Sequence, residues 1–144
     1  MTRQELVQLF NYDLWANRLW LAAIPNLPFS AEAIEIMDHV FRAQRIWLER
    51  CLNEQEIAVD ASKHDALAED LNAKWIDLVT IGDPEAFVSY ERSGEVHFQT
   101  LEQIAQHVIN HGTYHRGHLR GLCQAANTAD FPETDYILFC RESA

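Results

Sequence analysis

Apolar side chains recur at helical spacing in four stretches of the chain. These stretches are residues 2–24, 30–52, 67–79 and 101–126. Because residues three and four apart lie on one side of a helix, each stretch predicts an amphipathic helix with one face that must be buried. Four such helices, joined by short to medium connections, bury these faces most simply by packing against one another.

Local signals at the ends of the stretches support these boundaries. Pro25 follows the first stretch, and Ser30 is placed to act as the N-cap of the second. Gly82 follows the third stretch and is typical of a helix C-terminus. Thr100 and Gln103 have the spacing of a capping box, in which two side chains and two backbone N–H groups bond reciprocally. A long helix is therefore expected directly after Thr100.

Two further segments depart from helical spacing. Apolar and polar residues alternate over 87–99 around Ser93-Gly94, which predicts a short β-hairpin with its turn at these two residues. Residues 136–139 form an apolar run that we expect to be a short strand or an extended segment packed on the helices. The chain of 144 residues has room for one core. The pattern predicts an all-α protein, a single four-helix-bundle domain over residues 1–144 with a β-hairpin inserted before the last helix.

The chain is strongly acidic, with 22 acidic residues, 11 basic residues and a formal net charge of −11. This charge repels nucleic-acid phosphates and anionic lipid headgroups, so neither nucleic acid nor a membrane is expected as a partner. No apolar run approaches the roughly 20 residues that cross a bilayer, and the N-terminus lacks the layout of a secretory signal. The three cysteines are widely spaced, so we expect reduced thiols and a cytoplasmic protein.

Histidine is unusually frequent, with seven in the chain and four of them from His107 to His118. Two imidazoles three or four residues apart on a helix can bind one cation from the same side. The pairs His107/His111, His111/His115 and His115/His118 all have this spacing. On a helical wheel His115 falls within the apolar arc and His111 at its margin, which favours the middle pair. Histidines that bind no metal remain the alternative interpretation.

A third ligand has to come from another part of the chain. His39 lies at the edge of the apolar arc of the second helix, where a bundle helix meets a second neighbour, so its imidazole can reach inward. Alone, a histidine in this position is more often an interhelical hydrogen-bonding residue than a ligand. His64, in a polar linker, and His97, in the hairpin, are poorer candidates.

The first helix carries two polar residues where apolar ones are expected. Asp13 and Asn17 are four residues apart, near the middle of the apolar arc. A buried polar group without a hydrogen bond costs about 1–3 kcal/mol, so the pair indicates a polar cavity or a structural hydrogen bond to a neighbouring helix. Either residue could hydrogen-bond a ligand imidazole or position a water molecule, which makes both candidates for a supporting role. Tyr114 and Arg116 adjoin the histidines in sequence but are expected to point elsewhere.

Four segments together resemble the DinB (YfiT-like) proteins, bacterial four-helix bundles regarded as metal-dependent enzymes. The segments are NYDLWANRLW, DHVFRAQRIWL, HVINHGTYHRGHLRGL and TDYILF, and they cover nearly the whole chain in order. The resemblance implies a divalent metal held by His39, His111 and His115. It also implies a homodimer, and its characterised members include transferases that use low-molecular-weight thiols and a maleylpyruvate isomerase.

The resemblance and the residues together suggest a function. Three neutral imidazoles leave a divalent ion with its full charge and at least one position for a further ligand. Such a site can lower the pKa of bound water from about 15.7 to about 7, or hold a thiolate. Zinc or nickel is favoured, with iron or manganese as alternatives. We expect a metal-dependent transferase or hydrolase acting on a small molecule, with a low-molecular-weight thiol as the preferred substrate. The alternative is a non-catalytic stress- or damage-induced protein whose metal site is structural.

Oligomerisation has one sequence signal of its own. Tyr12, Trp15 and Leu19 form a second apolar stripe, opposite the inward arc of the first helix. This stripe fits either a homodimer contact or packing against the C-terminal tail.

Overall fold

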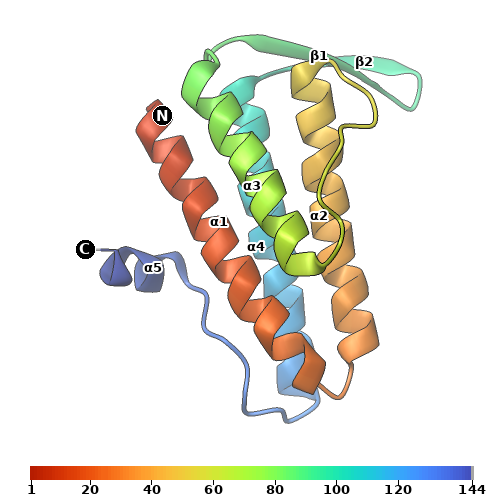
Figure 1. Cartoon of the computed structure of the whole chain (residues 1–144), viewed down its shortest axis with the longest axis vertical. Helices are drawn as coiled ribbons and strands as arrows, with labels where there is room; N and C mark the ends of the chain where they lie inside the picture. The colour runs from red at the N-terminus through yellow and green to blue at the C-terminus, as the bar shows by residue number, and fades with distance from the viewer. Residues whose placement is uncertain (144) are drawn as a thin grey trace.

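Four long helices run side by side along the molecule (Figure 1). The structure, a computed structural model, describes residues 1–143. The long helices are α1 (Arg3–Ala23), α2 (Ser30–Leu52), α3 (His64–Ile81) and α4 (Leu101–Ala125). The short elements are the 3₁₀ turn η1 (Ile24–Asn26), the strands β1 (Phe87–Arg92) and β2 (Glu95–Thr100), and the helix α5 (Tyr136–Glu142). The prediction of a mostly helical chain with a hairpin before the last long helix is confirmed.

The helix ends follow the local signals with one exception. Thr100 accepts a hydrogen bond from the Gln103 backbone N–H, and the Gln103 side chain accepts one from the Thr100 N–H, so the predicted capping box is present. Gly82 occupies the C-cap of α3, as expected. The expectation that Ser30 is an N-cap was wrong: α2 begins at Ser30 itself, Phe29 precedes it as the N-cap residue, and no side chain caps this end.

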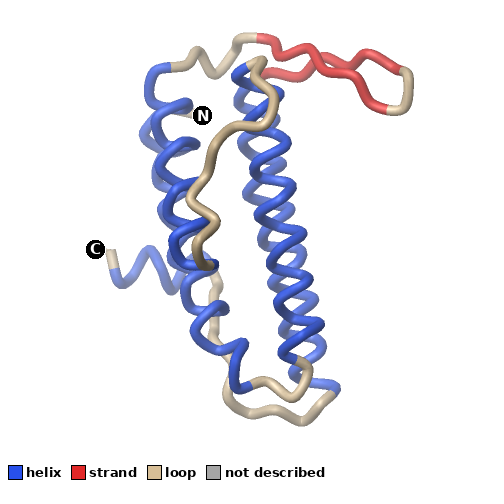
Figure 2. Tube along the Cα trace, turned by 45° about the vertical axis from the view of Figure 1, so that its right-hand side comes forward, coloured by secondary structure: helices blue, strands red, loops and turns tan. Residues whose placement is uncertain are grey.

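The two strands form an antiparallel hairpin that extends across one end of the helices (Figure 2). Phe87 lies opposite Thr100, and Arg92 lies opposite Glu95. Ser93 and Gly94 both have positive φ, 53° and 80°. Positive φ at both central residues is the requirement of the two-residue turn that matches the twist of a hairpin, which confirms the predicted turn.

The core consists of two hydrophobic clusters separated along α1 by a polar layer. Phe10 belongs to one cluster and stacks on Trp75 of α3 with ring centroids 5.1 Å apart. Trp20 belongs to the other cluster. Asp13 and Asn17 lie between them in α1 and are both 2% exposed. Apolar burial therefore holds both ends of the molecule together, and a buried polar network occupies the middle.

The C-terminal tail differs from the prediction. The run over 136–139 lies within α5, where a strand or an extended segment was expected. The helical spacing brings Tyr136 and Phe139 to the same side, and their rings lie 5.1 and 5.8 Å from that of Tyr12. The Tyr12 hydroxyl also donates a 2.7 Å hydrogen bond to the Thr134 carbonyl. The tail thus packs on the second apolar stripe of α1, and this packing favours the helix over the strand that the apolar run alone suggested.

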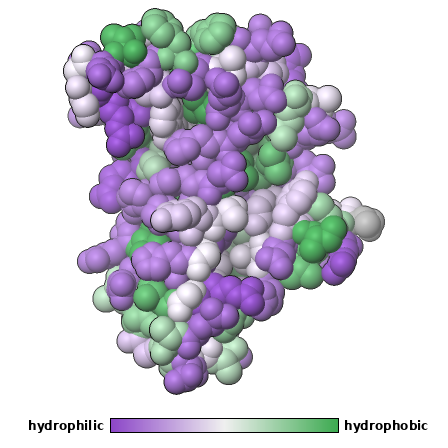
Figure 3. Space-filling view, turned by 180° about the vertical axis from the view of Figure 1, so that it is seen from behind, coloured by the Kyte–Doolittle hydropathy of each residue, from purple (hydrophilic) through white to green (hydrophobic). Residues whose placement is uncertain are grey.

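The surface is mainly hydrophilic. The face opposite to that of Figure 1 shows hydrophobic side chains in separate patches among polar ones (Figure 3). Within residues 1–143, no helix combines the length and the apolarity that crossing a lipid bilayer requires.

Candidate metal centre

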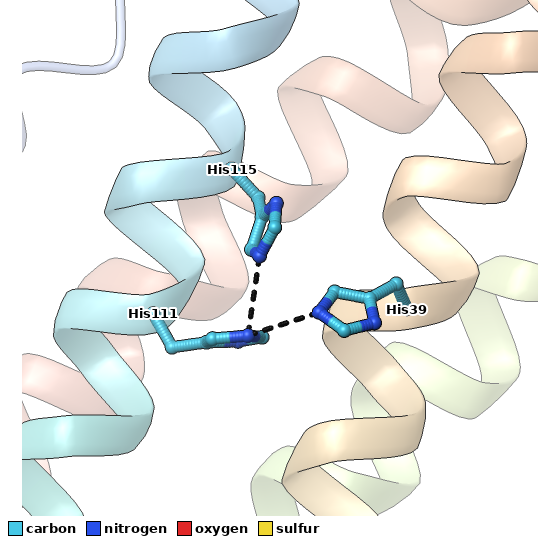
Figure 4. A group of neighbouring side chains, drawn as sticks. All are labelled: His39, His111 and His115. Atoms are coloured by element: carbon cyan, nitrogen blue, oxygen red, sulfur yellow. Dashed lines mark hydrogen bonds between the residues drawn. The ribbon is translucent and has the colours of Figure 1, made fainter.

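Three imidazoles from two helices converge between α2 and α4 (Figure 4). His39 projects from α2, and His111 and His115 project from successive turns of α4. The Nε2 atom of His111 lies 3.1 Å from that of His39 and 3.2 Å from that of His115. One ring nitrogen from each residue lies within 4.8 Å of the other two. The structure therefore brings together the three histidines that the sequence singled out.

These separations are more compatible with a bound cation than with hydrogen bonding alone. A neutral imidazole nitrogen carries either one proton or one lone pair, both in the ring plane, so His111 Nε2 can make a good hydrogen bond to only one neighbour. A cation can accept the lone pairs of all three rings. In a tetrahedral site with Zn–N distances of about 2.0–2.1 Å, ligand nitrogens are about 3.3 Å apart. The two short contacts match this spacing.

The environment keeps the α4 imidazoles neutral. Burial of the ring, and to a lesser extent positive charge on the neighbouring imidazoles of His115, His39 and His107, lower the pKa of His111 from 6.5 to about 4. Burial also lowers the pKa of His115, and the charges of His39 and His118 act in the same direction. Near pH 7 both α4 imidazoles therefore have a free lone pair to donate to a cation.

The cluster contains only histidine ligands and is open on one side. Among residues 1–143, no cysteine, aspartate or glutamate joins the three imidazoles. His39 is exposed, whereas His111 and His115 are half-buried. A cation held here would keep its full charge and remain accessible to small molecules from the side of His39.

Asp13 and Asn17 lie in a buried network that joins three helices. Asp13 accepts hydrogen bonds from Arg116 of α4 at 2.7 Å, from Gln44 of α2 at 2.7 Å and from Asn17 at 3.1 Å. Asn17 also accepts a 2.7 Å bond from Arg116. Within the described part of the chain, none of these bonds reaches the three imidazoles. The network instead fixes the position of α4 relative to α1 and α2, and so supports the histidines indirectly.

Sequence reasoning missed two residues of this network. Arg116 was expected to point away, yet it is 2% exposed and forms an ion pair with Asp13. Gly112 was not considered, although a Cβ atom there would lie 2.7 Å from Asp13 Oδ1 and 2.9 Å from Arg116 Nη1. A signal was available: Ala105, Gly112, Arg116, Leu119 and Cys123 share a heptad-like line along α4, and all are buried. An arginine in that line predicts a buried acidic partner.

The other histidines lie outside the cluster. His107 packs against Trp47, with ring centroids 5.2 Å apart, and next to His111 at 5.8 Å. His64 is the first residue of α3, where a linker was expected, and its Nε2 lies 2.8 Å from Asp38 Oδ1. His97 is in β2, and its Nε2 atom lies 3.9 Å from Glu95 Oε2. His118 is exposed.

Comparison with known proteins agrees with the segments that resembled the DinB proteins. No family model matches the chain. The chain is 25% identical to Protein DinB of Bacillus subtilis (strain 168) over 158 aligned residues. The alignment covers 92% of this chain and 91% of that protein, so the similarity extends over the whole fold and is not confined to the histidine segments. The comparison thus shows a distant similarity to a DinB protein along nearly the whole chain.

Proposed function

We propose that this protein is a divalent-metal-dependent enzyme whose site, His39, His111 and His115, activates water or a small thiol for transfer to, or hydrolysis of, a small molecule. The observation that carries the proposal is the convergence of three ring nitrogens with no further ligand among the cysteine, aspartate and glutamate residues of 1–143. Structural zinc sites usually have four protein ligands, whereas catalytic sites keep a position for water or substrate. A three-histidine cluster on an accessible surface matches the second type.

The protein's own residues have separate tasks in this proposal. His111 and His115 supply neutral ligands from one helix, and His39 completes the set from α2. A bound divalent ion acts as a Lewis acid that favours deprotonation of water or a thiol near neutral pH. The Asp13–Arg116 pair holds α4 in place, so that the two α4 imidazoles keep their direction toward His39. Thiol transfer is the preferred reaction because of the DinB resemblance.

A substrate screen tests the enzymatic proposal. The zinc- or nickel-loaded protein is assayed with low-molecular-weight thiols and electrophilic acceptors, and in parallel with ester and amide substrates. We expect one class to react, with activity lost on chelation and restored by adding the metal. His115→Ala should be inactive under all conditions. Activity that survives chelation would exclude a metal-activated nucleophile.

The alternative is a non-catalytic protein in which the ion joins α2 to α4. It would require a fourth, permanent ligand, and a structure of the metal-loaded protein would show a protein side chain in that position. An exchangeable water or an added thiol on the ion would instead support catalysis. Loss of helical structure on chelation would also favour the structural role.

We further propose the wider context that the sequence suggested. The four long helices would form a DinB-like four-helix bundle as a single domain over residues 1–144, acting as a homodimer in the cytoplasm. The three cysteines are free thiols, which fits a reducing compartment. Since α5 covers part of the second apolar stripe of α1, a dimer contact would have to use another face of the protein or include both α1 and α5. Sedimentation analysis of the purified protein tests the dimer.

A further inference from the structure

A cavity of about 290 Å³ lies beside the candidate metal centre, between the hairpin, α2 and α4. His107 connects the two places: it lines the cavity, and its ring centroid is 5.8 Å from that of His111. His107 is one helical turn before His111 in α4, a rise of about 6 Å along the helix axis. The cavity and the three imidazoles are therefore neighbours along α4.

The lining of this cavity has an unusual charge for so acidic a chain. Acidic residues outnumber basic ones by 22 to 11 overall, yet the lining contains Arg92 and His107 and no carboxylate. Arg92 forms no ion pair within the described residues. Its cross-strand partner Glu95 instead lies 3.9 Å from His97. No carboxylate among the described residues thus holds the Arg92 guanidinium in an ion pair, which leaves its N–H groups available to a ligand.

Two glutamine amides add hydrogen-bond donors to the same wall. The Gln103 Oε1 atom accepts the Thr100 backbone N–H at 3.0 Å, which leaves its NH₂ group as the free end. The Gln99 Oε1 atom accepts the Tyr90 hydroxyl, which leaves its NH₂ group free as well. Neither NH₂ group has an acceptor among residues 1–143. Donors without acceptors, next to an unpaired arginine, form a surface that is complementary to a carboxylate.

The remaining wall is aromatic. Trp47 of α2 and Tyr90 of β1 line the cavity, with ring centroids 4.9 Å apart and ring planes at 79°. The Arg50 guanidinium lies 4.5 and 4.7 Å from the centroids of these two rings and adds a second positive charge nearby. We propose that this cavity binds the substrate of the metal site, and that the substrate is a small organic carboxylate with an apolar body. Arg92 binds the carboxylate, the aromatic wall contacts the body, and the reactive end points toward His111. That the bound carboxylate is a substrate rests on the proposed function, whereas its binding in the cavity does not.

Benzoate is a suitable probe because it combines a carboxylate with a flat ring, and benzamide is its neutral counterpart. Calorimetric titrations compare the wild type with Arg92→Gln and with Arg141→Gln, a matched change of an exposed arginine in α5. We expect benzoate to bind the wild type at least about tenfold more tightly than benzamide does. Arg92→Gln should weaken benzoate binding by at least about tenfold, or about 1.4 kcal/mol, whereas Arg141→Gln should not change it. The assignment would be overturned by equal affinities for benzoate and benzamide, by an unchanged benzoate affinity in Arg92→Gln, or by the absence of benzoate binding.

Two further measurements separate this inference from the metal proposal. In chelator-treated protein, benzoate binding that still depends on Arg92 supports the cavity even if the metal proposal fails. Benzoate binding that requires the metal and is unchanged by Arg92→Gln would show that benzoate binds the metal ion directly. This result would overturn the cavity assignment. In cobalt-loaded protein, bound benzoate should show paramagnetic broadening of its ring protons. Arg92-dependent binding without broadening would overturn the substrate role of the cavity.

Discussion

Arg116 of α4 donates a 2.7 Å hydrogen bond to Asp13 of α1, and the two side chains are 2% and 3% exposed. The residues are 103 positions apart in the sequence. This ion pair connects α4, which carries two histidines of the candidate metal centre, to α1, which carries none of them. Its burial means that each charge depends on the other, because water cannot replace a lost partner.

Removing one partner of this pair is expected to destabilise the fold strongly. Asp13→Ala leaves the Arg116 charge buried without its counterion, and should lower the free energy of unfolding by about 3–5 kcal/mol. Urea denaturation followed by circular dichroism measures the change. The matched control is Arg18→Gln, which removes the exposed ion pair with Glu69 and should cost less than about 1 kcal/mol. Similar losses in both variants would show that the buried pair has no special role.

Gly112 is expected to be intolerant of even a methyl group. A Cβ atom there would lie 2.7 Å from Asp13 Oδ1 and 2.9 Å from Arg116 Nη1, so Gly112→Ala must displace the ion pair. Elsewhere in α4, a Cβ atom at Gly121 would meet no neighbouring side chain or element within 4 Å. Replacing a helical glycine by alanine in open space stabilises by about 0.5–1 kcal/mol. Thermal unfolding should therefore show opposite shifts, with Gly112→Ala less stable and Gly121→Ala more stable than the wild type.

Metal analysis distinguishes among the histidine pairs of α4. We expect about one divalent ion per chain, and His115→Ala should lose most of it because two imidazoles form a weak site. The double variant His107→Ala/His118→Ala should keep its ion, since neither residue belongs to the cluster. If the double variant loses the ion while His115→Ala retains it, the assignment of ligands is wrong.

Acid should destabilise the metal-free protein before its carboxylates are protonated. The pKa of His111 is about 4 in the folded chain and 6.5 when unperturbed, so the unfolded chain binds the proton more readily between these values. The free energy of unfolding must then decrease as the pH falls from about 6.5 to about 4, and His111 contributes no pH dependence above that window. Urea titrations of chelated protein at several pH values measure the slope. His111→Gln should have a shallower slope, and an equal slope in both proteins would contradict this origin.

Spacing within single helices was enough to predict much of the structure. The hairpin turn at Ser93-Gly94 and the capping box at Thr100 are local signals, and both are present. The convergence of His111 and His115 also follows from their four-residue spacing. His39 lies at the edge of a helical face, and its place in the ligand set came from the DinB resemblance. The turn, the capping box and the His111/His115 pair each depend on residues only a few positions apart.

The features that were missed depend on contacts between distant segments. Arg116 was expected to point away from the histidines. The α4 pattern alone can indicate that it is buried, but it cannot identify its partners Asp13 and Asn17, which come from α1. The run at 136–139 has the composition of a strand. It is helical where Tyr136 and Phe139 both reach Tyr12, more than 120 residues earlier, at ring distances of 5.1 and 5.8 Å.

The buried Asp13–Gln44–Arg116 network has a consequence for how a metal ion would enter the candidate site. Gln44 and Arg116 come from the same two helices as the imidazoles, and both donate hydrogen bonds to Asp13. These bonds hold the two helices in place without a cation. The donor nitrogens can therefore be arranged before any ion arrives. The fraction of sites that hold an ion would then depend on the concentration of exchangeable metal in the cell. Binding and release of the ion would not require the chain to fold or unfold.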